Sequence, residues 1–105
     1  MRVIVLFKLK PGVEPAAYED WARRRDVPTV RALPSVDEFI VYRTTGLLGS
    51  EGKAPYDYVE VIDIADMQGF GTDIATEASR AVSAEFGDWA DAPVFLLTEE
   101  LGSVS

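Results

Sequence analysis

Two short apolar runs near the ends of the chain constrain its fold more than any other feature. Residues 3–9 read VIVLFKL and residues 94–98 read VFLLT, and β-branched and aromatic side chains dominate both. Runs of this kind, bounded by proline and glycine, predict β-strands. Neither run alternates apolar with polar residues, as a strand does when one of its faces meets water. We therefore expect both faces of these two strands to be buried.

Two further strands are predicted at residues 36–43 and 56–64, on either side of a glycine-rich loop at residues 44–55. Helical periodicity follows the first strand and returns after the third. The element order is therefore βαββαβ, the signature of an α+β, ferredoxin-like fold. We expect one domain over residues 1–105.

Each helical segment carries a predicted break. Asp26 stands shortly before Pro28, and its carboxylate is expected to cap a second short turn there. After the third strand, Asp66 is expected to cap a turn that two glycines interrupt before Thr72 restarts a longer helix.

The helices can cover only one face of such a sheet, yet its outer strands are apolar on both faces. A chain of 105 residues has nothing left to cover the second face. The simplest cover is another copy of the chain, with two sheets closing around a shared core. We therefore expect a homodimer in which two subunits form a dimeric α+β barrel.

Composition excludes several classes of function. The chain holds 10 Lys and Arg against 18 Asp and Glu, and its formal net charge of −8 disfavours nucleic acid and anionic membranes. It has no Cys and no His, which removes thiol nucleophiles, imidazole bases and the usual zinc sites. We expect no metal and no cofactor. No run is long enough for a signal sequence or a membrane span, so a cytoplasmic protein without membrane partners is expected.

The third predicted strand places a carboxylate among apolar neighbours, because Glu60 shares its face with Tyr58 and Ile62. A carboxylate in such a position must be paired, protonated or exposed in a cavity. One interpretation pairs Glu60 with Arg43 on the neighbouring strand, and the other makes it a general acid or base with a raised pKa. Tyr58 and Tyr42 are candidate hydrogen-bond donors to a developing oxyanion or enol.

Three consecutive arginines follow the first helix. Arg23 and Arg24 lie four residues after Glu19 and Asp20, which predicts solvated ion pairs. Arg25 instead extends the apolar stripe of the helix. Either it snorkels to solvent, or it is a cation at the mouth of a pocket between sheet and helix.

Aromatic residues on the same stripe also have two interpretations. Tyr18 and Trp21 are either core residues or the flat wall of a substrate site. Asp26 is either the helix cap or, if it faces the pocket beside Arg25, a candidate base.

Five segments of the chain resemble the REDY-like, HapK-type family: VIVLFKLKPGV, YEDWARRRDVPTV, LPSVDEFIVYRTTGLLGS, PYDYVEVIDIADM and PVFLLTEEL. The resemblance covers residues 3–101. It implies a dimeric α+β barrel. It also implies an association with bacterial clusters that make prodiginine pigments and related pyrrole or indole compounds.

Together, the residues and the resemblance predict a homodimeric, cofactor-independent enzyme of secondary metabolism. Its substrate would be a pyrrole- or indole-type aromatic intermediate, and its reaction a cyclisation, isomerisation or condensation. The predicted catalytic residues are Glu60, Asp26 and Tyr58, and the predicted substrate-binding residues are Tyr18, Trp21, Arg25 and Tyr42. Two alternatives stay open: a non-catalytic protein that holds or delivers a reactive intermediate, and a cofactor-free monooxygenase.

Overall fold

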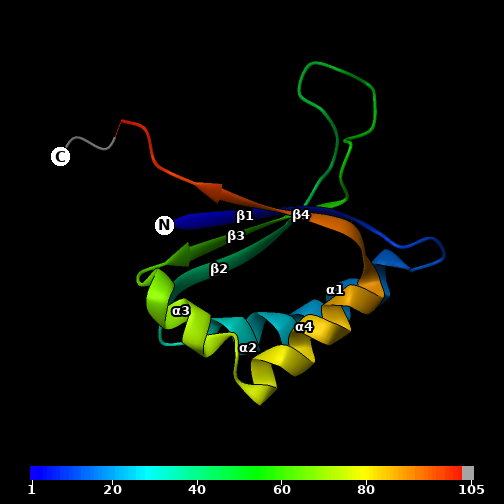
Figure 1. Cartoon of the computed structure of the whole chain (residues 1–105). Coiled ribbons are helices and arrows are strands. Elements are labelled where there is room, and N and C mark those ends of the chain that lie inside the picture. Colours follow the sequence, from blue (N-terminus) through cyan, green and yellow to red (C-terminus); the bar gives the residue numbers. More distant parts are fainter. Residues whose placement is uncertain (103–105) are drawn as a thin grey trace.

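The computed structural model describes residues 1–102. Its centre is an antiparallel four-stranded sheet with the strand order β2-β3-β1-β4 (Figure 1). The strands are β1 (Arg2–Leu9), β2 (Val36–Arg43), β3 (Tyr58–Ile64) and β4 (Ala90–Thr98). The element order and the sheet topology confirm the predicted α+β, ferredoxin-like βαββαβ fold.

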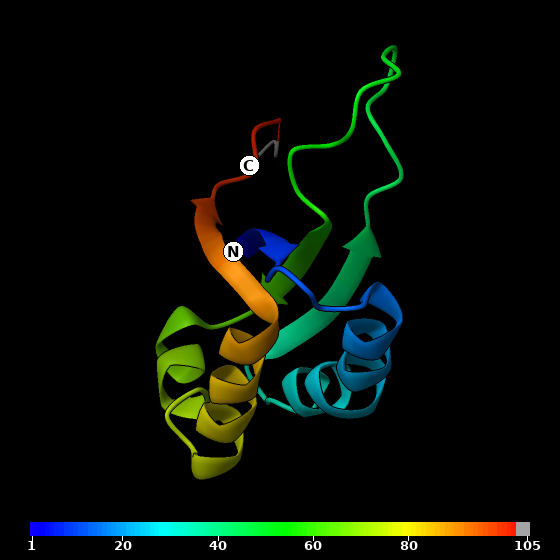
Figure 2. The ribbon, with the colours of Figure 1, turned by 90° about the vertical axis from the view of Figure 1, so that its right-hand side faces the viewer.

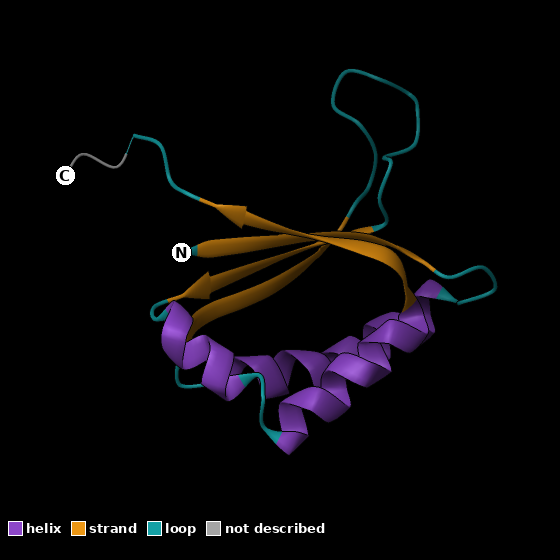
Figure 3. Cartoon of the chain, viewed as in Figure 1, coloured by secondary structure: helices purple, strands orange, loops and turns teal. Residues whose placement is uncertain are grey.

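All the helices lie on one side of the sheet (Figure 3). The first helical segment runs through α1 (Pro15–Trp21), η1 (Ala22–Asp26) and α2 (Val27–Arg31). The second consists of α3 (Met67–Asp73) and α4 (Glu77–Trp89). Figure 2 shows the two helical segments side by side beneath the strands.

The first helical segment does not break at Asp26, so the predicted cap is wrong. Asp26 has helical dihedrals (φ −65°, ψ −57°), and its side chain caps no backbone group. Pro28 has no backbone N–H to donate one turn back, and the chain accommodates it with a π-helical turn at η1. The Val27 N–H accordingly bonds to the Ala22 carbonyl, five residues back.

The second segment also departs from prediction. Asp66 does cap α3, since its carboxylate accepts a 3.1 Å hydrogen bond from the Gln68 N–H. The two glycines lie inside α3, however, and α4 begins after Thr76 rather than at Thr72. Tertiary contacts explain the difference, because the Asp73 carboxylate at the end of α3 accepts a 3.0 Å bond from the Ser35 N–H and holds the helix to the start of β2.

The helices cover one face of the sheet and leave the other open, and on the edge strand β4 the helix-side residues Phe95 and Leu97 also stay exposed, which the expected burial of this strand did not foresee. On β1, the side chains of Val3, Val5 and Phe7 are buried beneath the helices, whereas Ile4 and Leu6 point to the other side. The open face continues across the sheet through Val59, Val61, Ile40, Tyr42, Val94 and Leu96.

No helix within residues 1–102 covers this open face (Figure 1). The loop between β2 and β3 rises on the same side, with Leu48 fully exposed (Figures 1 and 2). The apolar character of both faces agrees with the sequence pattern, and the second copy of the chain remains a prediction.

Candidate functional site

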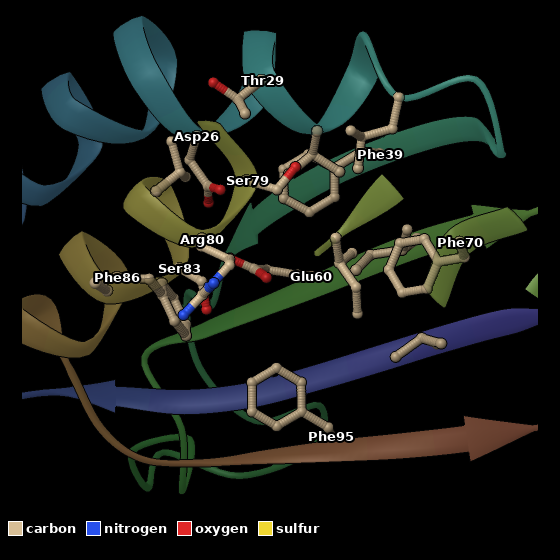
Figure 4. Close-up of a pocket in the computed structure, with 17 residues that line it drawn as sticks. Asp26, Thr29, Phe39, Glu60, Phe70, Ser79, Arg80, Ser83, Phe86 and Phe95 are labelled. Carbon is tan, nitrogen blue, oxygen red and sulfur yellow. The ribbon is translucent and has the colours of Figure 1, made fainter. Parts of the chain in front are cut away.

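A cavity of about 550 Å³ lies between the covered face of the sheet and the helices (Figure 4). Its volume is in the range of ordinary small-molecule sites. We call it the inner cavity. Apolar side chains form most of its wall, including Phe39, Ile62, Phe70, Val82, Phe86 and Phe95. Two carboxylic acids, Asp26 and Glu60, also line it.

Glu60 reaches the inner cavity because β3 alternates strictly between its two faces. Its side chain shares the covered face with those of Val5 and Val41, its partners on the neighbouring strands. Glu60 is only 5% exposed, and its Oε2 atom has no hydrogen-bond partner among residues 1–102. The predicted pairing with Arg43 is wrong, because the Arg43 guanidinium binds Glu19 at 3.2 Å.

Asp26 reaches the inner cavity because of the π-helical turn. In a π-helical turn, a backbone N–H bonds to the carbonyl five residues back. This wider turn brings Asp26, five residues after Trp21, onto the buried side of the helix and rotates Arg25 outward. Asp26 is 6% exposed. The carboxyl group therefore enters an apolar space with little access to water.

Burial sets the protonation of both acids. It raises the pKa of Asp26 to about 7, since the charged form loses its hydration. Burial also raises the pKa of Glu60 well above its usual range, and the charge of Asp26 raises it further. The Tyr18 hydroxyl lies close enough to lower the pKa of Glu60 as a donor, although it does not reach hydrogen-bonding geometry with any group in residues 1–102. The pair can both hold and release a proton near neutral pH.

Tyr18 belongs to the core beside this acid pair. It is fully buried and does not line the inner cavity. Its ring centroid lies 4.7 Å from that of Tyr58 and 5.5 Å from that of Phe7. Burial and the nearby Glu60 charge raise the pKa of its hydroxyl, which therefore stays protonated.

Trp21 and Arg25 hold helices together and do not line the inner cavity. The Trp21 indole N–H donates a 2.8 Å hydrogen bond to Glu85 on α4, and the Arg25 Nε donates a 3.0 Å bond to the same carboxylate. These two donors lower the pKa of Glu85 to about 2. The structure thus replaces the predicted cation at the pocket mouth with an ion pair between η1 and α4.

Tyr58 and Tyr42 also lie outside the inner cavity. The Tyr58 hydroxyl donates a 2.7 Å hydrogen bond to Glu19 and lines a separate cavity of about 480 Å³. Tyr42 is 51% exposed and shares the open face with its cross-strand partner Val59. Tyr42 therefore lies on the opposite face of the sheet from the inner cavity, because a one-residue step along a strand reverses the side-chain direction.

Arg23 and Arg24, the other two of the three consecutive arginines, form the predicted ion pairs. Arg24 pairs with Asp20 at 2.9 Å, and Arg23 approaches Glu19 at 3.6 Å. Both arginines are largely exposed, which agrees with a solvated helix face.

Sequence reasoning missed the contribution of α4. Ser79, Ser83 and Phe86 line the inner cavity, and so does Arg80, which is exposed to solvent. The helical spacing could have indicated this face of α4, because Ser79, Ser83 and Phe86 recur at four- and three-residue intervals beside the buried Val82.

Within residues 1–102, no group of three or more acidic, His or Cys side chains is arranged to hold a metal ion. Over the same residues, every helix is too short or too polar to cross a membrane.

Comparison with known proteins identifies the family. The family model described as REDY-like protein HapK matches residues 1–101. The chain belongs to the REDY-like HapK family. The crystal structure of HapK from Hahella chejuensis is 32% identical to this HapK-family chain, with a TM-score of 0.73 over 100% of this chain and 97% of that one. The resemblance found in the sequence is thereby confirmed.

More distant structures share the fold. A dimeric ferredoxin-like protein from Thermobifida fusca is 24% identical, with a TM-score of 0.69 over 90% of this chain and 85% of that one. SnoaB, a cofactor-independent oxygenase from Streptomyces nogalater, is 12% identical, with a TM-score of 0.70 over 98% of this chain and 96% of that one. None of the curated proteins compared with the chain matches it.

Proposed function

We propose that this HapK-family protein is a small cofactor-independent enzyme of bacterial secondary metabolism. It moves protons on a pyrrole- or indole-type aromatic intermediate held in the inner cavity. One observation carries the proposal: two buried carboxyl groups, those of Asp26 and Glu60, line the same apolar cavity. Neither carboxyl group forms an ion pair within residues 1–102.

The different environments of Asp26 and Glu60 suit them to different catalytic roles. Burial and the nearby Asp26 raise the pKa of Glu60, which favours its protonated form, and we assign Glu60 as the general acid. Asp26, with a pKa of about 7, is partly ionised at neutral pH and is the general base. Delivery of a proton to one ring position and removal from another gives an isomerisation, and the same steps assist a cyclisation or condensation.

The wall of the cavity supplies orientation. Phe39, Phe70, Phe86 and Phe95 come from different elements and surround the space that the acids face (Figure 4). Flat aromatic ligands pack against such rings in few orientations. A reactive intermediate fixed in one conformer then needs only proton transfer to react.

Turnover of a synthetic bispyrrole or bisindole intermediate tests the proposal. We expect Glu60→Gln and Asp26→Asn to lower turnover by about 100-fold or more, because each removes a titrating group while it preserves shape. Glu51→Gln and Asp20→Asn are matched controls, since both residues are exposed and lie outside the inner cavity. A Glu60→Gln protein that folds, binds the intermediate and reacts at the wild-type rate contradicts the acid role.

Two other functions are separated by the same assay. A protein that holds or delivers an intermediate binds it tightly without turnover. The fold shared with SnoaB, a cofactor-independent oxygenase, makes oxygenation the second alternative, and oxygen uptake during the reaction would support it.

A further inference from the structure

The charges around the inner cavity are unevenly placed. Its charged lining residues are Asp26 from η1, Glu60 from β3 and Arg80 from α4, whereas α2, α3 and the other three strands contribute only uncharged residues. Both acids are buried, and Arg80 is exposed. The buried charged groups of the cavity lining are therefore both acids, and the one cationic lining residue is exposed.

The acid pair leaves a polar position open toward a ligand. The Oε2 atom of Glu60 is buried, and no donor within residues 1–102 bonds to it. A buried carboxyl oxygen without a hydrogen-bond partner costs free energy. A ligand N–H that reached this atom would recover that cost and would be strengthened by any charge on the nitrogen.

The aromatic wall favours the same kind of ligand. The negative faces of Phe rings attract cations, and the attraction grows when the site excludes water. Phe39 is almost fully buried, and Phe86 is half-buried beside the acids. A planar nitrogen cation can stack on the phenylalanine rings and can also form hydrogen bonds with the two carboxyl groups.

We infer that the inner cavity selects a planar aromatic ligand with a cationic or protonatable nitrogen, and that Asp26 and Glu60 supply its counter-charge. This inference rests on the proposed function in taking the inner cavity as the substrate site. A neutral base takes the proton of one carboxyl group: its nitrogen lone pair forms the new N–H bond, and the O–H electrons remain on the carboxylate. A permanent cation instead displaces that proton to solvent.

Three isosteric probes test the inference by equilibrium calorimetry at pH 7: 2-naphthamidine as the cation, 2-naphthamide as the neutral form and 2-naphthoate as the anion. We expect the affinity for naphthamidine to exceed that for naphthamide by tenfold or more, and naphthoate to bind most weakly. Because naphthamidine favours the ionised pair, its affinity should rise from pH 6 to pH 8, and buffers of different ionisation heat should reveal proton release.

Variants assign the preference to the acid pair. Asp26→Asn and Glu60→Gln should each reduce the naphthamidine preference to about threefold or less, whereas Glu51→Gln, the same substitution at an exposed site outside the cavity, should retain it. Equal binding of naphthamidine and naphthamide overturns the inference. So does absence of naphthamidine binding. Tighter binding of naphthoate also overturns it and would point to Arg80 instead.

The outcome is independent of catalysis. A naphthamidine preference in a protein whose Glu60→Gln variant turns over normally supports the ligand class and contradicts the proposed function. Loss of turnover in that variant without a naphthamidine preference gives the opposite result.

Discussion

The negative charge of Asp26 raises the pKa of Glu60, although one residue lies on a helix and the other on the sheet beneath it. Both side chains are buried, so water screens their interaction weakly. Two acids this strongly coupled cannot easily be ionised together. Loss of the proton from one acid makes the other acid hold its proton more tightly. This coupling explains why the pair, rather than either residue alone, governs the expected behaviour.

The acid pair should make the fold less stable as the pH rises. The unfolded Asp26 loses its proton near the ordinary aspartate pKa of 3.8, but the folded residue, with a pKa of about 7, keeps it until neutral pH. The folded state therefore binds the proton more tightly, and its advantage disappears as the pH rises through this window. In urea unfolding, we expect the stability of Asp26→Asn relative to wild type to increase between about pH 4 and pH 7.5, by an amount on the order of a few kcal/mol. Parallel pH profiles for the two proteins would contradict the burial argument, and Asp20→Asn is the control.

The open sheet face should be the interface of a homodimer. Val61 lies at its centre, paired with Ile4 on one side and Ile40 on the other. Sedimentation at micromolar concentration should give about twice the chain mass of 11.5 kDa, and an obligate interface buries on the order of 2,000 Å² or more. Val61→Glu should yield monomers, because it places a charge in that interface. Ala81→Glu, on the exposed side of α4, should remain dimeric. A monomeric wild-type protein would refute the prediction.

The contact of Glu85 with Trp21 and Arg25 should stabilise the fold above about pH 4.5 and lose this effect in acid. The pKa of Glu85 is lowered from the ordinary glutamate value of 4.5 to about 2, so its contribution is fully present above pH 4.5 and is lost as the pH falls toward 2. At about pH 6, Glu85→Gln should melt below wild type, and the difference should shrink by about pH 2.5. Arg25→Gln should lower the melting temperature more than Arg23→Gln, whose residue is more exposed. Equal effects of the two arginine variants would contradict this assignment.

The hydroxyl of Tyr58 should contribute to stability through Glu19. Tyr58 is buried, and its hydroxyl donates a 2.7 Å hydrogen bond to the Glu19 carboxylate, which also binds Arg43. Tyr58→Phe removes a charge-assisted hydrogen bond, and we expect the free energy of unfolding to fall by about 1.5–3 kcal/mol. Tyr56→Phe is the control, because the Tyr56 hydroxyl forms no side-chain hydrogen bond in residues 1–102. Equal stability of Tyr58→Phe and wild type would show that Glu19 is satisfied without Tyr58.

Local patterns were sufficient to identify the four strands and to place Glu60, although β3 begins two residues later than expected and β4 begins four residues earlier. The bounds of β2 agree with those expected, and those of β1 differ by one residue, because strand propensity and turn residues act over a few neighbours. The alternation of side chains along β3 also placed Glu60 on the covered face without any knowledge of its surroundings.

The positions of the other candidate site residues depend on contacts that lie beyond local patterns. Tyr42 and Arg43 follow each other in the sequence, and only the pairing with β3 decides that Arg43 lies opposite Tyr58 on the covered face. The partner of Arg25 comes from α4, so no spacing within the first helical segment could reveal it.

The sequence by itself determined the βαββαβ order, the apolar character of both sheet faces and the buried position of Glu60. Only the tertiary structure decided that Asp26, and not Arg25, accompanies Glu60. That choice depends on a single residue of helical register at η1, where Pro28 removes a backbone donor and the helix widens. The sequence pattern of this segment also fits a helix without a π-helical turn. Packing of the segment against the sheet therefore selects which side chain is buried.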